Sequence, residues 1–470
     1  MTDLTALYQA IDERIEANFA AETEALAALL KIPSKRADPQ PGAPYGPACA
    51  QALDTALELG RSLGFSAVDL DHYIGYLETG SGPELLGVLA HLDVVPEGEG
   101  WSHPPYGAVI EDGVIWGRGT QDDKGPAIAA LYAMLALKEA GVIFDRRVRL
   151  ILGCDEESGS SDLVHYCAHA ETPGMIFSPD ADYPVVNGEK GILRAALSCA
   201  LPQEGLLPRV VSLAAGERVN IVVSSARARV EGLSAAEIRP AAAAAEAATG
   251  VTFVLKEEAG GLAIEALGTG AHGASPHKGN NAATALIGLL AVLPLQQKQA
   301  AVFSELARLL PHGDWEGKAL GIACSEPILG GLTCNLGLLS SGGGKLSAVL
   351  DIRYPLGHTG EDLVARMKKA AVLFDAQVVT DVAPHYVPAD HPLVQKLLEA
   401  YTEITGKEGR CLSIGGGTYA HDFACGVAFG CMFEDQEDLM HQPNERLPLE
   451  LLKLNTRILA RAIFKLSAKA

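Results

Sequence analysis

The sequence has no long apolar run and little positive charge. None of its 470 residues falls in an uninterrupted apolar stretch of about 18 or more, so we expect no membrane-spanning helix. The first residues, Met1 to Leu4, lack the basic and apolar regions of a secretory signal peptide, and we expect a cytoplasmic protein. Only 37 basic residues stand against 58 acidic ones, a net charge of −21. This charge argues against nucleic acid and anionic membrane as partners, because both favour a basic surface.

Several catalytic and cofactor signatures are also missing. The nine cysteines are odd in number and include no Cys-x-x-Cys pair, which indicates free thiols in a reducing compartment. The Gly117-x-Gly119 stretch lacks the third glycine of a dinucleotide fingerprint, and no Gly-Lys-Ser/Thr phosphate loop exists. No Gly-x-Ser-x-Gly nucleophile elbow is present. These absences exclude the common nucleotide-binding and serine-hydrolase patterns.

Helical and strand patterns alternate along the first part of the chain. The apolar run from Leu85 to Val95 is too short for a helix and predicts a strand buried on both faces. Further short strands are expected at 148–153 and 175–177, and helices at 5–31, 47–63 and 126–140. This alternation predicts an α/β fold with a mixed or parallel central sheet.

The sequence pattern changes in the middle of the chain. Two weakly similar stretches, 219–256 and 346–382, each read as strand, helix and strand, and the first begins with a strand expected at 219–223. They suggest a duplicated α+β unit within a long insertion. We therefore predict a catalytic domain formed by 1–188 and 383–470, interrupted by a lid or insertion domain at 189–382.

Five separate segments contain the side chains that bind divalent cations. Imidazole and carboxylate are ligands for zinc and for harder cations, and one carboxylate can bridge two cations about 3.5–4 Å apart. In α/β sheets, ligands bind beyond the carboxyl ends of the strands, where residues distant in sequence converge. We therefore predict a two-metal hydrolytic site. The segments are His91-Leu92-Asp93, Gln121-Asp122-Asp123-Lys124-Gly125, Asp155-Glu156-Glu157-Ser158-Gly159, Ser178-Pro179-Asp180 and His441-Gln442-Pro443-Asn444-Glu445.

Each segment alone has a plainer explanation. His91 and Asp93 could be a surface pair, and Asp122 could cap the helix that follows it. The adjacent pair Glu156 and Glu157 could be a solvated turn. Two neighbouring carboxylates could also serve two functions, with one binding the metal and the other accepting a proton. The joint occurrence of the five segments in this order favours the metal site.

The same segments resemble the M20 family of metallopeptidases, and most closely its PepV-type dipeptidases. The resemblance extends over nearly the whole chain. It implies a dizinc centre, with manganese or cobalt as alternatives, a cis peptide between Asp122 and Asp123, and Asp93 as the residue that orients His91. The implied ligands are His91 and Asp180 for one zinc, Glu157 and His441 for the other, and Asp122 as the bridge, with Glu156 as the general base.

The insertion then corresponds to the lid domain of this family. By resemblance, His272 would polarise the scissile carbonyl, Arg353 would bind the substrate carboxylate, and Asn220 would make a further polar contact. The glycine run that includes Gly415 and Gly416 would let backbone N–H groups approach the substrate.

The predicted activity is hydrolysis of dipeptides by metal-activated water. A small peptide held at both ends, between the sheet edge and the lid, is the expected substrate. An N-acyl-amino-acid deacylase of the same family and a non-catalytic metal- or peptide-binding protein are the alternatives. The doubled insertion would supply internally what relatives with a shorter lid obtain from a dimer mate, so we expect a monomer. Two departures from the family, at Tyr419-Ala420-His421 and Phe433-Glu434-Asp435, suggest a different substrate preference.

Overall fold

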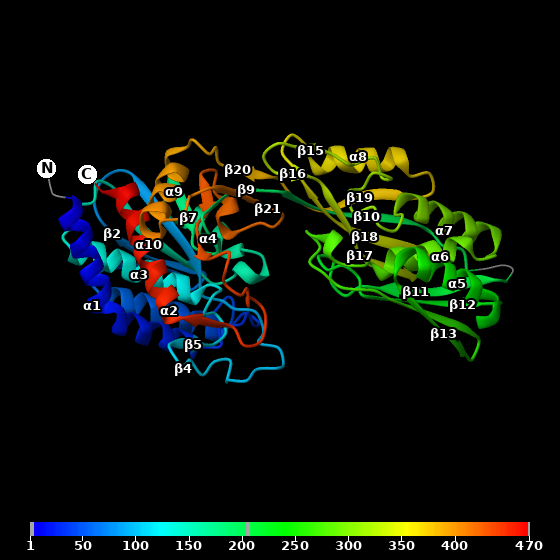
Figure 1. Cartoon of the computed structure of the whole chain (residues 1–470), viewed down its shortest axis with the longest axis horizontal. Helices are drawn as coiled ribbons and strands as arrows, with labels where there is room; N and C mark the ends of the chain where they lie inside the picture. Colours follow the sequence, from blue (N-terminus) through cyan, green and yellow to red (C-terminus); the bar gives the residue numbers. More distant parts are fainter. Residues whose placement is uncertain (1–3, 204–206, 469–470) are drawn as a thin grey trace. The chain divides into compact units, whose positions relative to one another are not determined.

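The computed structural model describes residues 4–203 and 207–468, which form two compact units (Figure 1). Unit 1 comprises Met1–Asn187, Tyr386–Leu412 and Thr418–Ala470, and unit 2 comprises Gly188–His385 and Ser413–Gly417. The short segment Ser413–Gly417 thus belongs to unit 2, although the chain on both sides of it belongs to unit 1. None of the described helices is long and apolar enough to cross a membrane.

Unit 1 is built on a mixed sheet. Its central strand β3 (Leu85–His91) is parallel to β6 (Arg147–Gly153) and to β7 (Met175–Ser178), and every residue of β3 is buried. The antiparallel strands are added at the sides, so the expected mixed sheet and the α/β class are confirmed. The remaining strands of this sheet are β1 (Ser66–Leu70), β2 (Ile74–Thr79), β22 (Gly426–Ala428), β9 (Val185–Glu189), β20 (His385–Tyr386) and β21 (Cys411–Ile414).

Helices cover both faces of this sheet. Alternate residues of β3 point to opposite faces, so Val88 joins the main core while Leu89 packs with Leu163 and Tyr166 of α4 (Ser161–His169) on the other face. The main core is closed by helices that contribute their apolar residues to it. These are α1 (Leu4–Leu30), α2 (Pro47–Ser62), α3 (Lys124–Glu139), α9 (Pro392–Thr405) and α10 (Leu449–Ser467).

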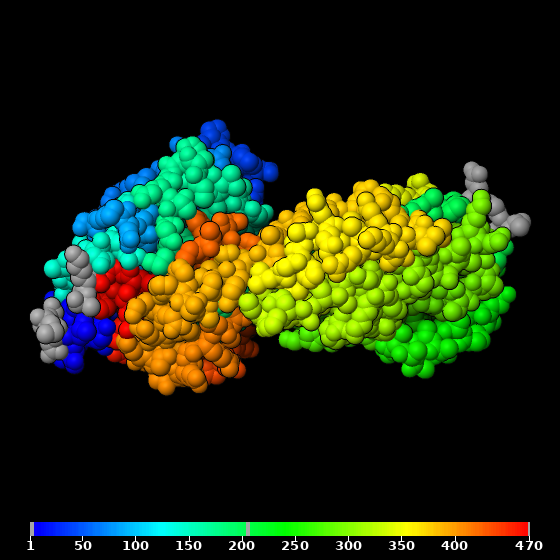
Figure 2. All heavy atoms as spheres, turned by 90° about the horizontal axis from the view of Figure 1, so that it is seen from above, coloured from blue at the N-terminus to red at the C-terminus, as the bar shows by residue number. Residues whose placement is uncertain are grey.

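The two ends of the chain pack together within unit 1. Helix α1, blue in Figure 1, lies against α10, red, and Arg457 of α10 pairs with Asp12 of α1 at 2.8 Å. The blue and red atoms are also adjacent in the space-filling view (Figure 2). Glu22 of α1 is completely buried in this contact and accepts a hydrogen bond from Thr456 of α10. The first and last helices therefore pack against each other and contribute to the same hydrophobic core.

Unit 2 is an eight-stranded antiparallel sheet with helices packed on one face. The strand order is β13-β14-β12-β11-β17-β18-β10-β19. Its helices are α5 (Ala235–Thr249), α6 (Ala282–Val292), α7 (Gln297–Leu309) and α8 (Gly360–Ala370). Its strands are β10 (Gly191–Ala200), β11 (Arg209–Ala215), β12 (Ser225–Glu231), β13 (Thr252–Glu258), β14 (Gly261–Leu267), β17 (Thr333–Gly342), β18 (Lys345–Tyr354) and β19 (Asp375–Val382).

The duplication expected in this region is visible in the strand order. In one half, the sequence β12-α5-β13 places its two strands on either side of β14, and both are antiparallel to it. In the other half, β18-α8-β19 flanks β10 in the same way. Strands β11 and β17 join the halves at the centre of the sheet. Unit 2 is therefore a pair of β-α-β units, each closed around one additional strand.

The prediction of a strand at 219–223 in this unit is wrong. Residues 219–223 form an irregular segment with a single bridge, between Ile221 and His272, and the strand begins only at Ser225. The amide of Asn335 donates hydrogen bonds to the carbonyls of Val219 and Ile221, which occupies backbone groups that a strand would use in its ladder. Within this stretch Val222 and Val223 are buried while Ile221 is exposed, so its apolar residues do not form a strand.

Smaller sheets complete the structure. They are β4 (Val109–Glu111) with β5 (Val114–Trp116) and β24 (Arg446–Pro448), β8 (Ala181–Asp182) with β23 (Cys431–Met432), and β15 (Ser325–Glu326) with β16 (Gly330–Gly331). All nine cysteines are free thiols, as their irregular spacing predicted.

Candidate metal centre and substrate-binding residues

Three neighbouring parallel strands of unit 1 end in ionisable residues. His91 is the last residue of β3, Asp155 to Glu157 follow β6, and Asp180 comes two residues after β7. Because parallel strands present their carboxyl ends at one edge of a sheet, these side chains meet there. Asp122 reaches the same edge from the loop that precedes α3.

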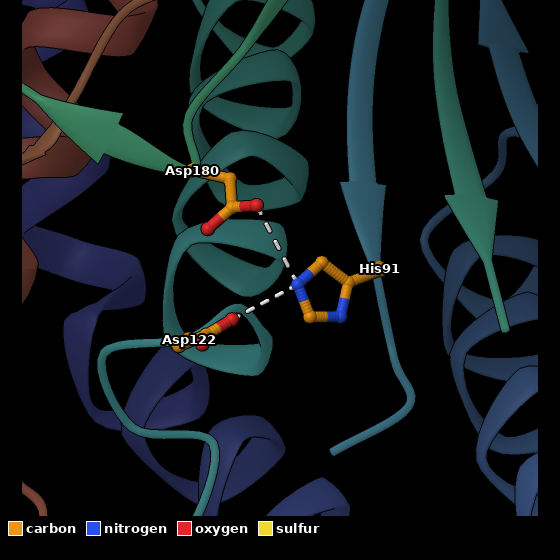
Figure 3. Close-up of side chains that lie close together, drawn as sticks. All are labelled: His91, Asp122 and Asp180. Carbon is orange, nitrogen blue, oxygen red and sulfur yellow. Dashed lines mark ion pairs between the residues drawn. The ribbon is translucent and has the colours of Figure 1, made fainter. Parts of the chain in front are cut away.

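The first group of side chains comprises His91, Asp122 and Asp180 (Figure 3). The Nε2 atom of His91 lies 2.9 Å from Oδ1 of Asp122 and 3.6 Å from Oδ2 of Asp180. Figure 3 shows both carboxylates pointing toward this one nitrogen. One imidazole nitrogen facing two carboxylates is a donor set that suits a divalent cation such as zinc.

The second group shares Asp122 with the first. The Nε2 atom of His441 lies 3.0 Å from Oδ2 of Asp122 and 3.0 Å from Oε1 of Glu157. Asp122 therefore presents one oxygen to each imidazole. Its peptide bond with Asp123 is cis, as the resemblance implied. In the part of the chain that the structure describes, these two groups are the ones whose donor atoms are close enough to hold a metal ion.

The protonation of His91 fits a metal ligand. Its Nδ1 atom lies 3.0 Å from the backbone carbonyl of Asp93, which accepts a hydrogen bond from an Nδ1–H. Burial would lower the pKa of His91, but without a cation the carboxylates of Asp122, Asp180 and Asp93 outweigh burial and raise that pKa well above its usual value. With a cation bound, the proton would stay on Nδ1 and the lone pair of Nε2 would face the cation. This buried Nε2 has no hydrogen-bond partner among the described residues, although it is surrounded by oxygen atoms. A cation between them would satisfy all of these atoms.

The charges around this group are also unbalanced. Burial raises the pKa of Glu156 well above its usual value, and the carboxylates of Asp180 and Glu157 raise it further. Burial would likewise raise the pKa of Asp122, but the imidazoles of His441 and His91 hold it well below its usual range. Bound cations would relieve the repulsion among these carboxylates.

Asp93 has a wider role than the orientation of His91. Its Oδ1 lies 3.5 Å from Nδ1 of His91, farther than its own carbonyl oxygen, while its carboxylate accepts the backbone N–H groups of Glu156 at 3.3 Å and Glu157 at 3.2 Å. The backbone of Asp93 therefore orients the imidazole, and its carboxylate holds the turn that carries the two glutamates. Glu156 belongs to neither ligand group.

Glu445 holds the loop that carries Asp122, a role that the sequence pattern did not reveal. Its fully buried carboxylate accepts the backbone N–H groups of Gly119 at 3.0 Å and Gln121 at 2.8 Å, and it pairs with Arg118 at 2.6 Å. Glu445 follows His441 by four residues, so one short segment provides a candidate ligand and also positions another. Its place in that segment was the only signal in the sequence.

Asp162 and Tyr419 were also missed. The Asp162 carboxylate accepts the N–H groups of Cys154 and Asp155 and the hydroxyl of Tyr419, at 2.7, 3.0 and 2.5 Å. The ring of Tyr419 meets that of His91 edge to face, with centroids 6.2 Å apart. This buried network joins the turn after β6 to the segment after the glycine run, and no local motif indicates it.

The expected substrate-binding residues gather within unit 2. Arg353 donates from Nη1 to the carbonyl of Gly415 at 2.7 Å, and Gly273, next to His272, donates its N–H to the carbonyl of Asn220 at 2.7 Å. Gly416 lies beside Gly415 in the segment assigned to this unit. Arg353 is thus linked to Gly415, and Asn220 to the neighbour of His272, although both pairs are distant in sequence.

The imidazole of His272 is set up to donate a proton or a hydrogen bond from Nε2. The backbone N–H of Ala274 donates to its Nδ1 at 3.3 Å, which leaves the neutral ring protonated on Nε2. Burial lowers the pKa of His272, and the positive charge of Arg353 lowers it further. A neutral imidazole of this kind can stabilise a developing oxyanion.

Comparisons with known proteins match this chain to a peptidase family and to dipeptidases. The sequence pattern of peptidase family M20/M25/M40 matches residues 87–465. The chain is 38% identical over 433 residues to the putative dipeptidase YtjP of Bacillus subtilis, which covers 91% of this chain and 92% of that protein. It is 34% identical over 429 residues to a Beta-Ala-Xaa dipeptidase of Lactobacillus delbrueckii, with 90% and 91% covered. The crystal structure of human carnosine dipeptidase 1 shares the fold, with a TM-score of 0.57 at 15% identity and 98% of each chain covered.

Proposed function

Because the chain belongs to peptidase family M20/M25/M40, we propose that it is a zinc-dependent dipeptidase with two cations and with Glu156 as its general base. The observation that carries this proposal is the sharing of Asp122 between two ligand groups, with Glu156 beside them but in neither. The names of the two relatives above, a putative dipeptidase and a Beta-Ala-Xaa dipeptidase, support dipeptides as the substrate class.

The ligand assignment follows the two groups. His91 and Asp180 would hold one cation, Glu157 and His441 the other, and Asp122 would bridge them. Zinc suits a set of imidazoles and carboxylates, and manganese or cobalt could replace it. When bound, such cations polarise a carbonyl group and increase the acidity of water.

Glu156 would then transfer the protons. Its backbone N–H is held by the Asp93 carboxylate, and its side chain belongs to neither ligand group and so is free to accept a proton. It would take a proton from the attacking water and deliver it to the leaving amine when the peptide bond breaks.

Two residues of unit 2 would recognise the substrate. Arg353 would bind the terminal carboxylate through paired N–H groups, and His272 would donate its Nε2–H to the carbonyl oxygen as negative charge develops there. A dipeptide carries its carboxylate one residue beyond its only peptide bond. Recognition of that carboxylate would therefore favour dipeptides over longer chains.

The test is hydrolysis of a panel containing β-Ala-His, Leu-Leu, Ala-His and N-acetyl amino acids by metal-reconstituted protein. We expect dipeptide turnover, and we expect Glu156→Gln to reduce kcat by about 10²–10⁴-fold with the metal content unchanged. Turnover of acyl amino acids alone would indicate a deacylase. A protein that binds metal but hydrolyses none of these compounds would be a binding protein, and the proposal would be wrong.

A further inference from the structure

The sheet of unit 2 holds a second buried charge beside Arg353. We infer that Asp351 is a positioning residue that makes Arg353 selective for substrates with a free terminal carboxylate. This inference rests on the proposed function, because it takes Arg353 as the residue that binds that carboxylate. It adds a residue to which neither the motifs nor the family match assigns a role.

Asp351 and Arg353 form a bidentate pair. Nε of Arg353 lies 3.1 Å from Oδ1 of Asp351, and Nη2 lies 3.0 Å from Oδ2. Asp351 is completely buried and Arg353 is 4% exposed, so water does not compete for these hydrogen bonds. Two parallel hydrogen bonds between planar groups fix the orientation of the guanidinium as well as its position.

The local sheet geometry explains the pairing. Residues 351 and 353 are two apart on β18, so their side chains lie on the same face of the strand. The residues between and before them, Ile352 and Leu350, point into the apolar core beneath the helices. Asp351 and Arg353 therefore lie on the opposite face of the sheet, where the His272 loop and the glycine segment also lie against them.

The hydrogen bonds that Arg353 makes within the protein leave two of its N–H groups for a ligand. A guanidinium has five N–H groups: one on Nε and two on each Nη nitrogen. Asp351 takes one from Nε and one from Nη2, and the carbonyl of Gly415 takes one from Nη1 at 2.7 Å. One N–H is left on each Nη nitrogen. Two donors on adjacent nitrogens match the two oxygens of a carboxylate and not the single oxygen of an amide.

Asp351 also limits the position of the His272 loop. A Cβ atom added to Gly273 would lie 2.5 Å from Oδ2 of Asp351, so the loop approaches this carboxylate closely. Gly273 in turn donates its N–H to Asn220. The Asp351 carboxylate thus lies between the residue that would bind the substrate carboxylate and the loop that would contact the scissile carbonyl.

The prediction concerns the preference for an acid over its amide. We would measure kcat/KM for the best dipeptide of the panel and for its C-terminal amide with wild-type holoenzyme, Asp351→Asn, Arg353→Ala and the double variant. In Asp351→Asn we expect the preference for the acid to fall about 10-fold or more, mainly through a higher KM for the acid. Turnover of the amide should change by less than about 3-fold, and adding Asp351→Asn to Arg353→Ala should have little further effect.

A matched control is available in the same sheet. The Asp381 carboxylate accepts hydrogen bonds from the Tyr354 hydroxyl at 2.7 Å and from the Gly360 N–H at 3.1 Å, and among the described residues it makes no hydrogen bond with the Arg353 side chain. Asp381→Asn should leave the preference unchanged. Asp351→Glu, which keeps the charge but displaces it by one methylene, provides a second variant and should also lose the preference.

The outcomes separate this inference from the function on which it rests. If the wild-type enzyme hydrolyses no dipeptide, the proposed function is wrong. If it hydrolyses the acid and the amide equally well, the proposed role of Arg353 is wrong. A preference that Arg353→Ala abolishes but Asp351→Asn retains would overturn the role of Asp351 alone. Equal losses for acid and amide, or failure of both Asp351 variants to fold, would make Asp351 a structural residue and would also overturn the inference.

Discussion

Individual carboxylates in this protein serve two different purposes at the candidate metal centre. Asp122, Glu157 and Asp180 face imidazoles and are candidate ligands. Asp93 and Glu445 face backbone N–H groups, and they hold the turn and the loop from which the ligands project. Supporting contacts of this kind fix the orientation of ligands, and their loss typically lowers metal affinity by about 10–100-fold.

Glu445→Gln tests this support directly. The amide would keep one oxygen acceptor but would lose the charge that pairs with Arg118 and the second acceptor for the loop. We expect the zinc affinity of the apoprotein to fall about 10–100-fold, measured by titration calorimetry against a competing chelator. Glu171→Gln also removes a carboxylate charge paired with an arginine, Arg147, but at the exposed surface of the same unit, and it should leave the affinity unchanged. An unchanged affinity in Glu445→Gln would show that the loop holds its shape without this residue.

Glu22 gives a prediction for the dependence of stability on pH. Burial raises the pKa of Glu22 to about 8, partly offset by the hydrogen bond from Thr456, and its Oε2 has no partner among the described residues. Because the folded pKa is above the unfolded value, protonation stabilises the protein fully below the unfolded pKa of about 4.3. That stability is lost as the pH rises through about 8.

Glu22→Gln, which resembles the neutral acid, should therefore gain about 4 kcal/mol of stability relative to wild type between pH 5 and pH 9. Urea denaturation of both proteins across this range measures the difference. A difference that does not depend on pH would contradict the raised pKa of Glu22.

At the scale of elements, the end of β6 is the junction on which the site depends. The turn after this strand carries Glu156 and Glu157, and it is held by Asp162 of α4 and by Tyr419 of the short helix that follows the glycine segment. Gly153, the last residue of β6, lies so close to Tyr419 that an added Cβ would be 1.9 Å from the hydroxyl oxygen. A small residue here allows two elements to meet.

A double-mutant cycle tests this junction. Tyr419→Phe removes a hydrogen bond to the buried Asp162 carboxylate and should reduce the free energy of unfolding by about 1–3 kcal/mol. Gly153→Ala should destabilise the protein more strongly, and should do so less when the hydroxyl is absent in the Tyr419→Phe background. Strictly additive effects in urea denaturation would show that the two residues do not compete for this space.

At the scale of the whole molecule, the chain is divided into two units with separate cores. Both candidate ligand groups lie in unit 1, and His272, Arg353 and Gly415 lie in unit 2. The predicted boundaries at 188 and 382 are close to the crossings at 187/188 and 385/386, but the sequence did not predict that Ser413–Gly417 belongs with unit 2.

Metal removal should therefore affect the two units unequally. A ligand that binds only the folded state stabilises it by about 4 kcal/mol at a concentration 1,000 times its Kd. In differential scanning calorimetry we expect chelation by EDTA to lower the melting temperature of the transition that belongs to unit 1 and to leave that of unit 2 in place. Hydrogen exchange monitored by mass spectrometry would assign each transition. Equal shifts in both units would contradict the confinement of the ligands to unit 1.

The duplicated sheet of unit 2 leads to a prediction about assembly. If the second β-α-β unit replaces a partner subunit, the 49.2 kDa chain should be a monomer in solution. Light scattering of the metal-loaded protein at micromolar concentrations measures this. A dimer mass, together with loss of activity on dilution, would show that the doubled sheet does not replace a partner.

The resemblance to the M20 family is confirmed by the family match, and the α/β class by the mixed sheet of unit 1. The helices expected at 5–31 and 47–63 correspond to α1 and α2 within one residue. These elements were predictable because apolar periodicity and proline act locally. The strand expected at 219–223 was not found, because the side chain of Asn335, more than 100 residues away, determines the path of that segment.

The sequence by itself determined which residue types were available for chemistry, their order along the chain and the family to which they belong. Strand ends and helix starts are local features, and they already brought His91, Asp155 and Asp180 to one edge of a sheet. Only the tertiary structure decided which carboxylates face imidazoles and which face backbone N–H groups. That distinction depends on contacts such as those of Glu445 with Gly119 and of Asp351 with Arg353, which arise when folding buries charges that must find partners.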